Sequence, residues 1–412
     1  MYINIFDLIA ILITLSAFLM YINFKYLKMP MTIGLMFLSI VLSFFIMIAG
    51  WFDSSVVITF ENIFNQIDFN QTLMGGMLSF LLFAGALHVD INDLNKQKDI
   101  ISILATIGVV FTTFLVGIIS FYLFTFLGFN IDFIYCLLFG ALIAPTDPIS
   151  VLAILKNAKA PKELETKIAG ESLFNDGVGV VVFTVILDQL TSQTSFDMKN
   201  VLLIFIEEAI GGILFGFFIG WLFYKLLKTV DDYILEIMLT LSLVTGGYAL
   251  ASHLHLSGPL AMVVAGLLIG NHGKNFAMSD VTHRQLFSFW ELIDEFLNAC
   301  LFVLMGVAVL VISFNIKYII AGFLCIPLVL MVRFISIAIP VKFIFTKKRF
   351  SKNIVNIMTW GGLRGGISIA LALSLINTVP DNNAQFIITI TYIVVVFSIL
   401  VQGLTIDRLI KK

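Results

Sequence analysis

The feature that most constrains this chain is a succession of apolar stretches, each about 20 residues long, separated by short polar connections. A helix of that length crosses the hydrocarbon core of a bilayer, which is about 30 Å thick. Charged residues make up only 12% of the 412 residues, whereas soluble domains contain roughly 25%. The pattern predicts an all-α polytopic membrane protein and excludes a soluble globular domain.

Thirteen apolar segments are predicted to be transmembrane helices. The least regular is 258–272, which is short and contains Gly258, Pro259 and Gly266. The connections between the segments are too short to form a soluble domain. The predicted helices cover residues 3–24, 31–50, 72–89, 100–127, 132–156, 166–190, 200–228, 233–252, 258–272, 286–313, 318–341, 353–376 and 384–404.

The distribution of basic residues predicts the orientation. With the N-terminus outside, most of the 24 Lys and Arg residues fall in loops on the inner side, as the positive-inside rule requires. The first segment has no basic leader and no small-residue cleavage site, so we expect a first transmembrane helix and not a removed signal. We therefore expect a multi-pass protein of the cell membrane with a cytoplasmic C-terminus.

A polar stripe interrupts the apolar segment 166–190. Glu171, Ser172, Asn175 and Asp176 fall at helical spacing, so their side chains occupy one side of a helix. Ionisable side chains are costly in lipid unless they face protein or water, and there they usually serve function. Carboxylate, hydroxyl and amide oxygens are the ligands that hard cations prefer. The stripe therefore predicts a cation site.

The predicted helix 132–156 is interrupted at residues 145–148, which read Pro-Thr-Asp-Pro. Each proline lacks a backbone donor and clashes with the preceding turn. Within a membrane, such a break is tolerated where the freed groups meet protein or a cavity. A simple kink would explain the prolines but not Asp147, so we expect an unwound segment whose carbonyls and Thr146 hydroxyl face an ion.

The predicted helix 353–376 has a second interruption, in which four glycines within 361–366 surround Arg364. Interrupted helices at corresponding places in two halves of a chain indicate a secondary transporter with its site near the midplane. There Arg364 would supply a fixed positive charge. The alternative is glycine-mediated helix packing with an arginine that reaches the interface, although Arg364 lies roughly 17 Å from the inner end.

Depth along the helices suggests which charges meet. Glu171 and Arg333 lie at similar depths from the inner side, whereas Asp147, Asp176 and Arg364 lie near the midplane. Depth therefore favours Arg333 over Arg364 as the partner of Glu171, and leaves Arg364 as the alternative.

Acidic residues also occur at helical spacing near the inner start of 286–313, namely Glu291, Asp294 and Glu295. They either line an inner funnel or are ordinary interface charges.

Several motifs, in chain order, resemble the cation:proton antiporter-1 family, the NhaP-like sodium/proton antiporters and their eukaryotic exchanger relatives. The Asn175-Asp176 element with its upstream Glu171-Ser172 is the most specific of them. The matching stretches are 139–141 with 146–148, 170–177, 289–291 with Asn298 and 301–302, and 362–365.

The resemblance implies an inverted-repeat fold of the NhaA/NhaP type, with two broken crossing helices, a moving ion-carrying core and a dimerisation domain. We expect the core at about 72–190 and 318–404, and the scaffold at about 3–50 and 200–313. It also implies a homodimer without a bound cofactor.

The resemblance further assigns roles to the polar residues. Asp176 would be the exchanged-ion carboxylate and would bind Na⁺ together with Ser172 and Thr146. Glu171 would pair with Arg333, and Arg364 would support the site. The ion-binding residues would be Asp176, Asn175, Ser172, Thr146 and Asp147. One departure is Ala84, because many relatives carry a glutamate at this place in the third segment.

These observations predict an alternating-access antiporter, not an enzyme, that exchanges Na⁺, Li⁺ or K⁺ for H⁺ and serves pH homeostasis. A carboxylate with two mutually exclusive occupants couples the fluxes, because crossing the low-dielectric barrier with an empty, charged site is unfavourable. Asn175 does not titrate, which favours electroneutral exchange. The alternatives are a cation channel, which would favour a repeated pore motif, and an intramembrane enzyme, which would favour paired metal motifs.

Overall fold

The computed structural model describes residues 5–53, 72, 76–147, 151–152, 155, 161–191, 198–273, 278–312, 315–344, 353–376 and 378–410. Pro148 and the first residues of the predicted helix 3–24 lie outside these ranges.

The described chain is helical, and each of the predicted apolar ranges contains helix. Nine helical segments in the described residues are long and apolar enough to cross a membrane, so the chain is a multi-pass membrane protein. The exact number of crossings stays a prediction. The long helices are α1 (Ile5–Ile22), α2 (Met31–Phe52), α6 (Lys98–Ala105) continuing into α7 (Ile107–Phe126), α10 (Lys162–Thr191), α11 (Met198–Leu227), α12 (Tyr233–His253), α15 (Asp280–Val307), α16 (Ile316–Ile339) and α19 (Asp381–Phe397).

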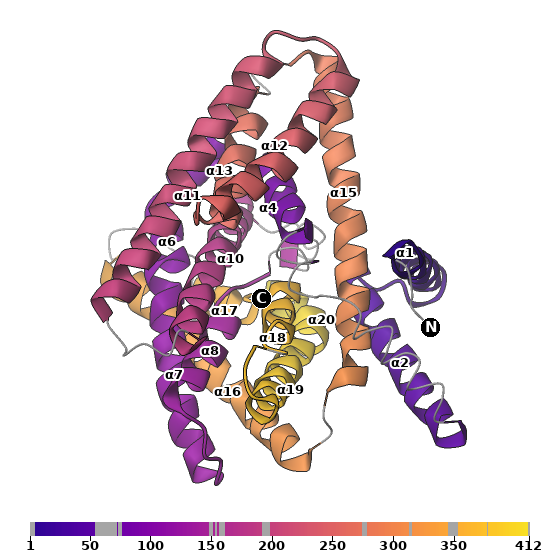
Figure 1. Ribbon diagram of the computed structural model, residues 1–412, viewed down its shortest axis with the longest axis vertical. Helices are drawn as coiled ribbons and strands as arrows, with labels where there is room; N and C mark the ends of the chain where they lie inside the picture. Colours follow the sequence, from indigo (N-terminus) through magenta and orange to yellow (C-terminus); the bar gives the residue numbers. More distant parts are fainter. Residues whose placement is uncertain are drawn as a thin grey trace.

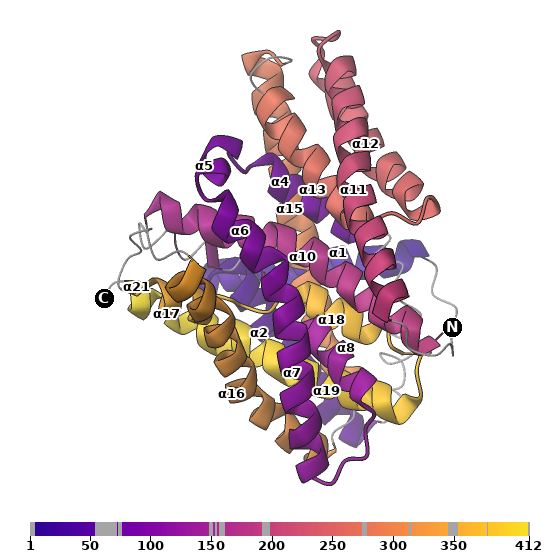
Figure 2. The ribbon, with the colours of Figure 1, turned by 90° about the vertical axis from the view of Figure 1, so that its left-hand side faces the viewer.

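The remaining helices are shorter. Those in apolar segments are α4 (Leu78–Leu87), α8 (Phe133–Ile143), α13 (Gly258–Leu268), α17 (Ile354–Trp360) and α18 (Gly366–Leu373). Polar or terminal ones are α5 (Ile91–Lys96), α20 (Gly403–Thr405) and α21 (Asp407–Ile410). Figures 1 and 2 show that α10 and α18 lie in the middle of the molecule, and that the ends of α11, α12 and α15 extend beyond the other helices at the top.

The two predicted breaks are confirmed. Helix α8 ends at Ile143 and is followed by non-helical residues up to Asp147, while α17 and α18 are separated by residues 361–365. The backbone N–H of Asp147 donates to the carbonyl oxygen of Leu363 at 2.8 Å. The two unwound segments therefore meet and satisfy part of each other's backbone.

The order of elements repeats within the chain. A long helix, a broken helix and a second long helix occur as α7, α8 and α10, and again as α16, α17/α18 and α19. The two units pack together, because α16 contacts both α7 and α19 while α18 and α19 contact α8. This arrangement brings both breaks to one place in the bundle.

Helix α4 packs chiefly against α13 and α15, with a smaller contact to α10. The resemblance implies that 72–89 belongs to the ion-carrying core and that about 200–313 belongs to the scaffold. The contacts place α4 beside helices of the predicted scaffold.

Two helices begin at least four residues earlier than predicted. Helix α15 starts at Asp280 and not at 286, and the side chain of Ser279 caps it by accepting from the Thr282 N–H. Helix α10 starts at Lys162 and not at 166. Hydropathy finds only the part of a helix that matches the bilayer, whereas capping and polar contacts extend the helix into the polar region.

Candidate functional site

The break after α8 is held by two side chains of α10. The hydroxyl groups of Thr146 and Ser172 lie 2.9 Å apart. The Asn175 amide donates to the Thr146 hydroxyl at 2.8 Å, and its oxygen accepts from the Thr146 N–H at 3.2 Å. Asn175 therefore satisfies backbone that the loss of helix leaves unpaired, and all three side chains are buried.

Sequence explains why α8 ends here and why α10 can approach. Pro145 cannot donate to the helix, so the regular backbone pattern stops before it. The proline ring then packs directly on Gly179 of α10, where any Cβ would overlap it. A glycine at this position allows the break to lie against the helix that carries the polar stripe.

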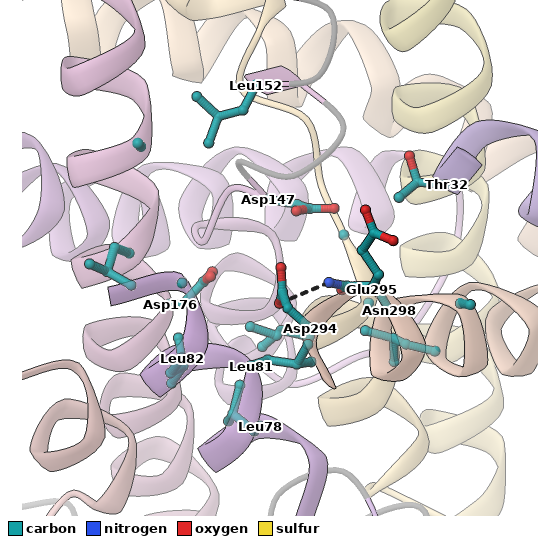
Figure 3. Close-up of a pocket in the computed structure, with 18 of the residues that line it drawn as sticks. Thr32, Leu78, Leu81, Leu82, Asp147, Leu152, Asp176, Asp294, Glu295 and Asn298 are labelled. Carbon is teal, nitrogen blue, oxygen red and sulfur yellow. Dashed lines mark hydrogen bonds between the residues drawn. The ribbon is translucent and has the colours of Figure 1, made fainter. Parts of the chain in front are cut away.

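Asp147 and Asp176 line a cavity of about 610 Å³ between the two broken units and helices α2, α4 and α15. In Figure 3 the carboxyl groups of Asp147, Asp176 and Asp294 point into one shared space. Asp176 is only 6% exposed although it lines the cavity. Two acidic side chains, with the hydroxyl groups of Thr146 and Ser172 nearby, form a mixed oxygen environment that suits a hard cation.

Asp147 also lies at the start of α18. A Cβ added to Gly365, the residue before α18, would come within 2.7 Å of Asp147 Oδ2. The glycine therefore permits this close approach. The positive end of the α18 dipole stabilises negative charge on a nearby carboxylate.

Arg364 contacts backbone carbonyls at the break and does not simply point at the acidic groups. Its Nη1 donates to the carbonyl oxygens of Ala144 and Pro145 at 2.7 and 2.8 Å. Its own N–H donates to the Ser398 hydroxyl at 2.9 Å. A buried positive charge therefore satisfies the negative end of the α8 dipole.

Glu171 and Arg333 lie together, with Arg333 Nη1 at 2.5 Å from Glu171 Oε1. Their side chains are 2% and 7% exposed, so the ion pair is nearly dry. Gly362 packs against the guanidinium, since a Cβ there would come within 2.7 Å of Nε. The pair joins α10 to α16 and contacts the second break.

The four polar side chains of the stripe on α10 therefore have different partners. Ser172 and Asn175 bind Thr146, Asp176 faces the cavity, and Glu171 binds Arg333. Ser172 and Asn175 thus contact the first break directly, whereas Glu171 contacts Arg333 of α16, which packs on Gly362 of the second break.

Ala84 lies in an apolar cluster with Phe83 and Trp290. The Phe83 and Trp290 rings are 4.7 Å apart between centroids. Leu82 and Gly85 of the same helix face the cavity. Position 84 of this chain is therefore part of an apolar cluster that α4 shares with α11, α12, α13 and α15.

The sequence left open the role of the α15 side chains that form another wall of the cavity. The wall consists of Glu291, Asp294, Glu295 and Asn298, which follow one another at helical spacing along one face. This helical spacing is the feature of the sequence that indicates a shared polar face. Ser398, which binds the Arg364 backbone, carried no signal that distinguishes it from other buried serines.

Comparisons with known proteins agree with this geometry. The model of the sodium/hydrogen exchanger transmembrane family matches residues 14–412. The Na⁺/H⁺ antiporter NhaP of Pseudomonas aeruginosa is 46% identical over 98% of this chain and 96% of its own length. The Na⁺/H⁺ antiporter NhaH of Halobacillus aidingensis is 32% identical over 100% of this chain and 97% of its own.

The fold is also that of a solved structure. The sodium proton antiporter MjNhaP1 from Methanocaldococcus jannaschii, at pH 8, superimposes with a TM-score of 0.76 at 22% sequence identity. The superposition covers 100% of this chain and 99% of the other. Because the family model and the relatives extend over nearly all of the sequence, the chain belongs to the sodium/hydrogen exchanger family.

Proposed function

We infer that this protein is a sodium/proton antiporter that exchanges Na⁺ or Li⁺ for H⁺ across a membrane, with K⁺ as a third candidate cation. Family membership and the names of the relatives support this function. The observation that carries it is the unwound Thr146, hydrogen-bonded to Ser172 and Asn175 of α10, beside two carboxylates that line one cavity. A cation and a proton would compete for these oxygens.

Asp176 is proposed as the exchanged-ion carboxylate. It is buried yet faces the cavity, so its negative charge is unfavourable unless a proton or a cation neutralises it. Ser172 and Thr146 would supply hydroxyl oxygens, and Asp147 a second charge. Asn175 would hold Thr146 in place without adding a titrating group.

The other charges of the site are proposed to be fixed. Glu171 is paired with Arg333, and Arg364 donates to the carbonyls at the break. One titrating carboxylate then exchanges one proton for one monovalent cation. The exchange would be electroneutral, would break no covalent bond and would need no resident cofactor.

Alternating access would move the two repeated units together, because the contacts between α16, α7, α8 and α19 make one body of them. The proposed core is therefore 100–190 with 318–404. Helix α4, which packs against α13 and α15, would stay with the scaffold of 3–50 and 200–313. We further propose a homodimer in the cell membrane, with the N-terminus outside, the C-terminus in the cytoplasm, and a role in pH homeostasis.

Reconstituted vesicles with an internal pH dye test the function. An outward proton gradient should be dissipated on addition of Na⁺ or Li⁺, and Asp176→Asn should abolish this response in folded protein. Asp188→Asn, at an exposed position on the same helix, is the matched control and should retain exchange.

Near-normal exchange by the Asp176→Asn protein would remove Asp176 from the mechanism. Repeating the assay at clamped membrane potentials tests the stoichiometry. A rate or equilibrium point that shifts steadily with potential would contradict one-for-one exchange.

A further inference from the structure

The cavity has a second polar wall, which faces Asp147 and Asp176 and belongs to α15. Asp294 and Asn298 are one helical turn apart, and the Asn298 amide nitrogen donates to Asp294 Oδ1 at 3.1 Å. Figure 3 shows this pair beside Glu295, with the Asp294 carboxyl directed toward the same space as Asp147 and Asp176. Both residues of the pair line the cavity.

Asn298 has an acceptor without a partner. Its side chain is 4% exposed, and its Oδ1 makes no hydrogen bond within the part of the chain that the structure describes. An acceptor that is removed from water and left unpaired costs about 1–3 kcal/mol. The amide nitrogen is bound to Asp294, so the oxygen is the unpaired atom of a buried residue that lines the cavity beside a carboxylate.

The pair has the chemistry of a cation site. A carboxylate and an amide oxygen are ligands for hard monovalent cations, and the neighbouring acidic groups raise the local concentration of cations. The neighbouring Glu291 and Glu295 are exposed, so water hydrates their carboxylates and a bound ion is not required to stabilise their charge. Asp294 and Asn298 differ from them because Asp294 is partly buried and Asn298 is buried.

We propose that Asp294 and Asn298 form a second binding site for a monovalent cation, which receives Na⁺ or Li⁺ on the α15 wall before it passes to Asp176. This proposal rests on the proposed antiport function and adds a step to it. Helix α15 packs against α2 and α4, outside the two repeated units. The second site therefore stays with the scaffold, and the moving core takes the ion from it.

Equilibrium binding of radioactive ²²Na⁺ to purified protein tests the site directly. The background is Asp176→Asn, in which the exchange carboxylate is lost. This protein should still bind Na⁺ with weakened affinity, and Asp294→Asn or Asn298→Ala added to it should remove the remaining binding. Glu291→Gln in the same background removes an equal charge one turn away, at an exposed position. It removes only part of the general attraction for cations, so most of the binding should remain.

Transport by the single variants gives a second readout. Asp294→Asn and Asn298→Ala should raise the apparent KM for Na⁺ by roughly three- to tenfold, the effect of losing one oxygen contact, while the maximal rate is retained. Asp294→Glu, which keeps the carboxylate, should be closer to the unchanged protein. A residue that only supports folding would lower the melting temperature and the maximal rate instead.

Two results would overturn the second site. One is the absence of ²²Na⁺ binding to the Asp176→Asn protein while the unchanged protein binds and exchanges Na⁺, which would leave the antiport function standing. The other is Na⁺ binding in that background that survives both Asp294→Asn and Asn298→Ala. Failure of the antiport function itself is distinct, because the unchanged protein would then show no sodium-dependent proton flux.

Discussion

Arg364 Nη1 lies 2.7 Å from the carbonyl oxygen of Ala144, so a side chain of the second broken helix caps the end of the first. The same nitrogen also binds the Pro145 carbonyl. The helix ends at Ile143, and among the described residues neither carbonyl accepts a hydrogen bond from a backbone N–H. The arginine thus stabilises the geometry that places Thr146 and Asp147 at the cavity.

Replacement of Arg364 should damage both stability and transport. Arg364→Gln removes the positive charge and leaves buried carbonyls unpaired, at a cost of about 1–3 kcal/mol or more. We expect a lower melting temperature in detergent and loss of sodium-dependent proton flux. Arg364→Lys keeps the charge with a shorter reach and should recover part of the stability. Unchanged melting of Arg364→Gln would show that the capping contacts contribute little.

The Glu171–Arg333 pair predicts non-additive destabilisation. Removing one member of a buried pair leaves an uncompensated charge, at a cost of about 3–5 kcal/mol. Glu171→Gln and Arg333→Gln should each lower thermal stability more than Asp176→Asn does. The double variant should lose less than the sum of the two single losses, because the charges disappear together. Strict additivity in the melting experiments would show that the contact carries no coupling energy.

Thr146 joins the break to α10 through its hydroxyl group, and this predicts a difference between two substitutions. Thr146→Val removes the partner of Ser172 and of the Asn175 amide, so we expect a loss of about 1–3 kcal/mol and a raised apparent KM for Na⁺. Thr146→Ser keeps the hydroxyl and should behave nearly as the unchanged protein. Equal effects of the two substitutions would assign the loss to packing and not to hydrogen bonding.

Much of this architecture follows from local sequence. Pro145 and the glycines beside Arg364 predict the two breaks, because their effect on a helix is local. Helical periodicity alone places Glu171, Ser172, Asn175 and Asp176 on adjoining faces. The lengths of the apolar stretches identify the transmembrane segments. The ends of the helices depend on capping residues such as Ser279 and are less well predicted.

Contacts between distant elements are harder to predict. The Asn175–Thr146 and Arg364–Ala144 hydrogen bonds need the relative position of helices far apart in the chain. The packing of α4 against α13 and α15 has the same origin. The sequence marks Asn298 only as part of a family motif, and its place on the wall of the cavity depends on how α15 packs.

A polar link outside the membrane gives a prediction on pH. Asp93 of α5 lies 2.5 Å from Lys162 of α10 and 2.8 Å from Lys96. The hydrogen bonds with Lys162 and then Lys96 lower the pKa of Asp93 from 3.8 to about 2. A carboxyl whose folded-state pKa is lowered stabilises the protein above its unfolded pKa, and this contribution is lost as the pH falls through the folded value.

The melting temperatures of the unchanged protein and Asp93→Asn should therefore differ by the same small amount between pH 8 and about pH 5. The difference should shrink as the pH falls from about 4 toward 2. High salt should reduce it at every pH, because the lysines are exposed. A difference that changes between pH 6 and 8 would assign the effect to another group.

The proposed exchange depends on one carboxyl group that holds either a proton or a cation. Calorimetric titration of the purified protein with Na⁺, repeated in buffers of different protonation enthalpy, measures the protons released per cation bound. At a pH where Asp176 is protonated, saturating Na⁺ should release about one proton per protein molecule, and the Asp176→Asn protein should release none. Sodium binding without proton release, or unchanged release from Asp176→Asn, would contradict competition at Asp176.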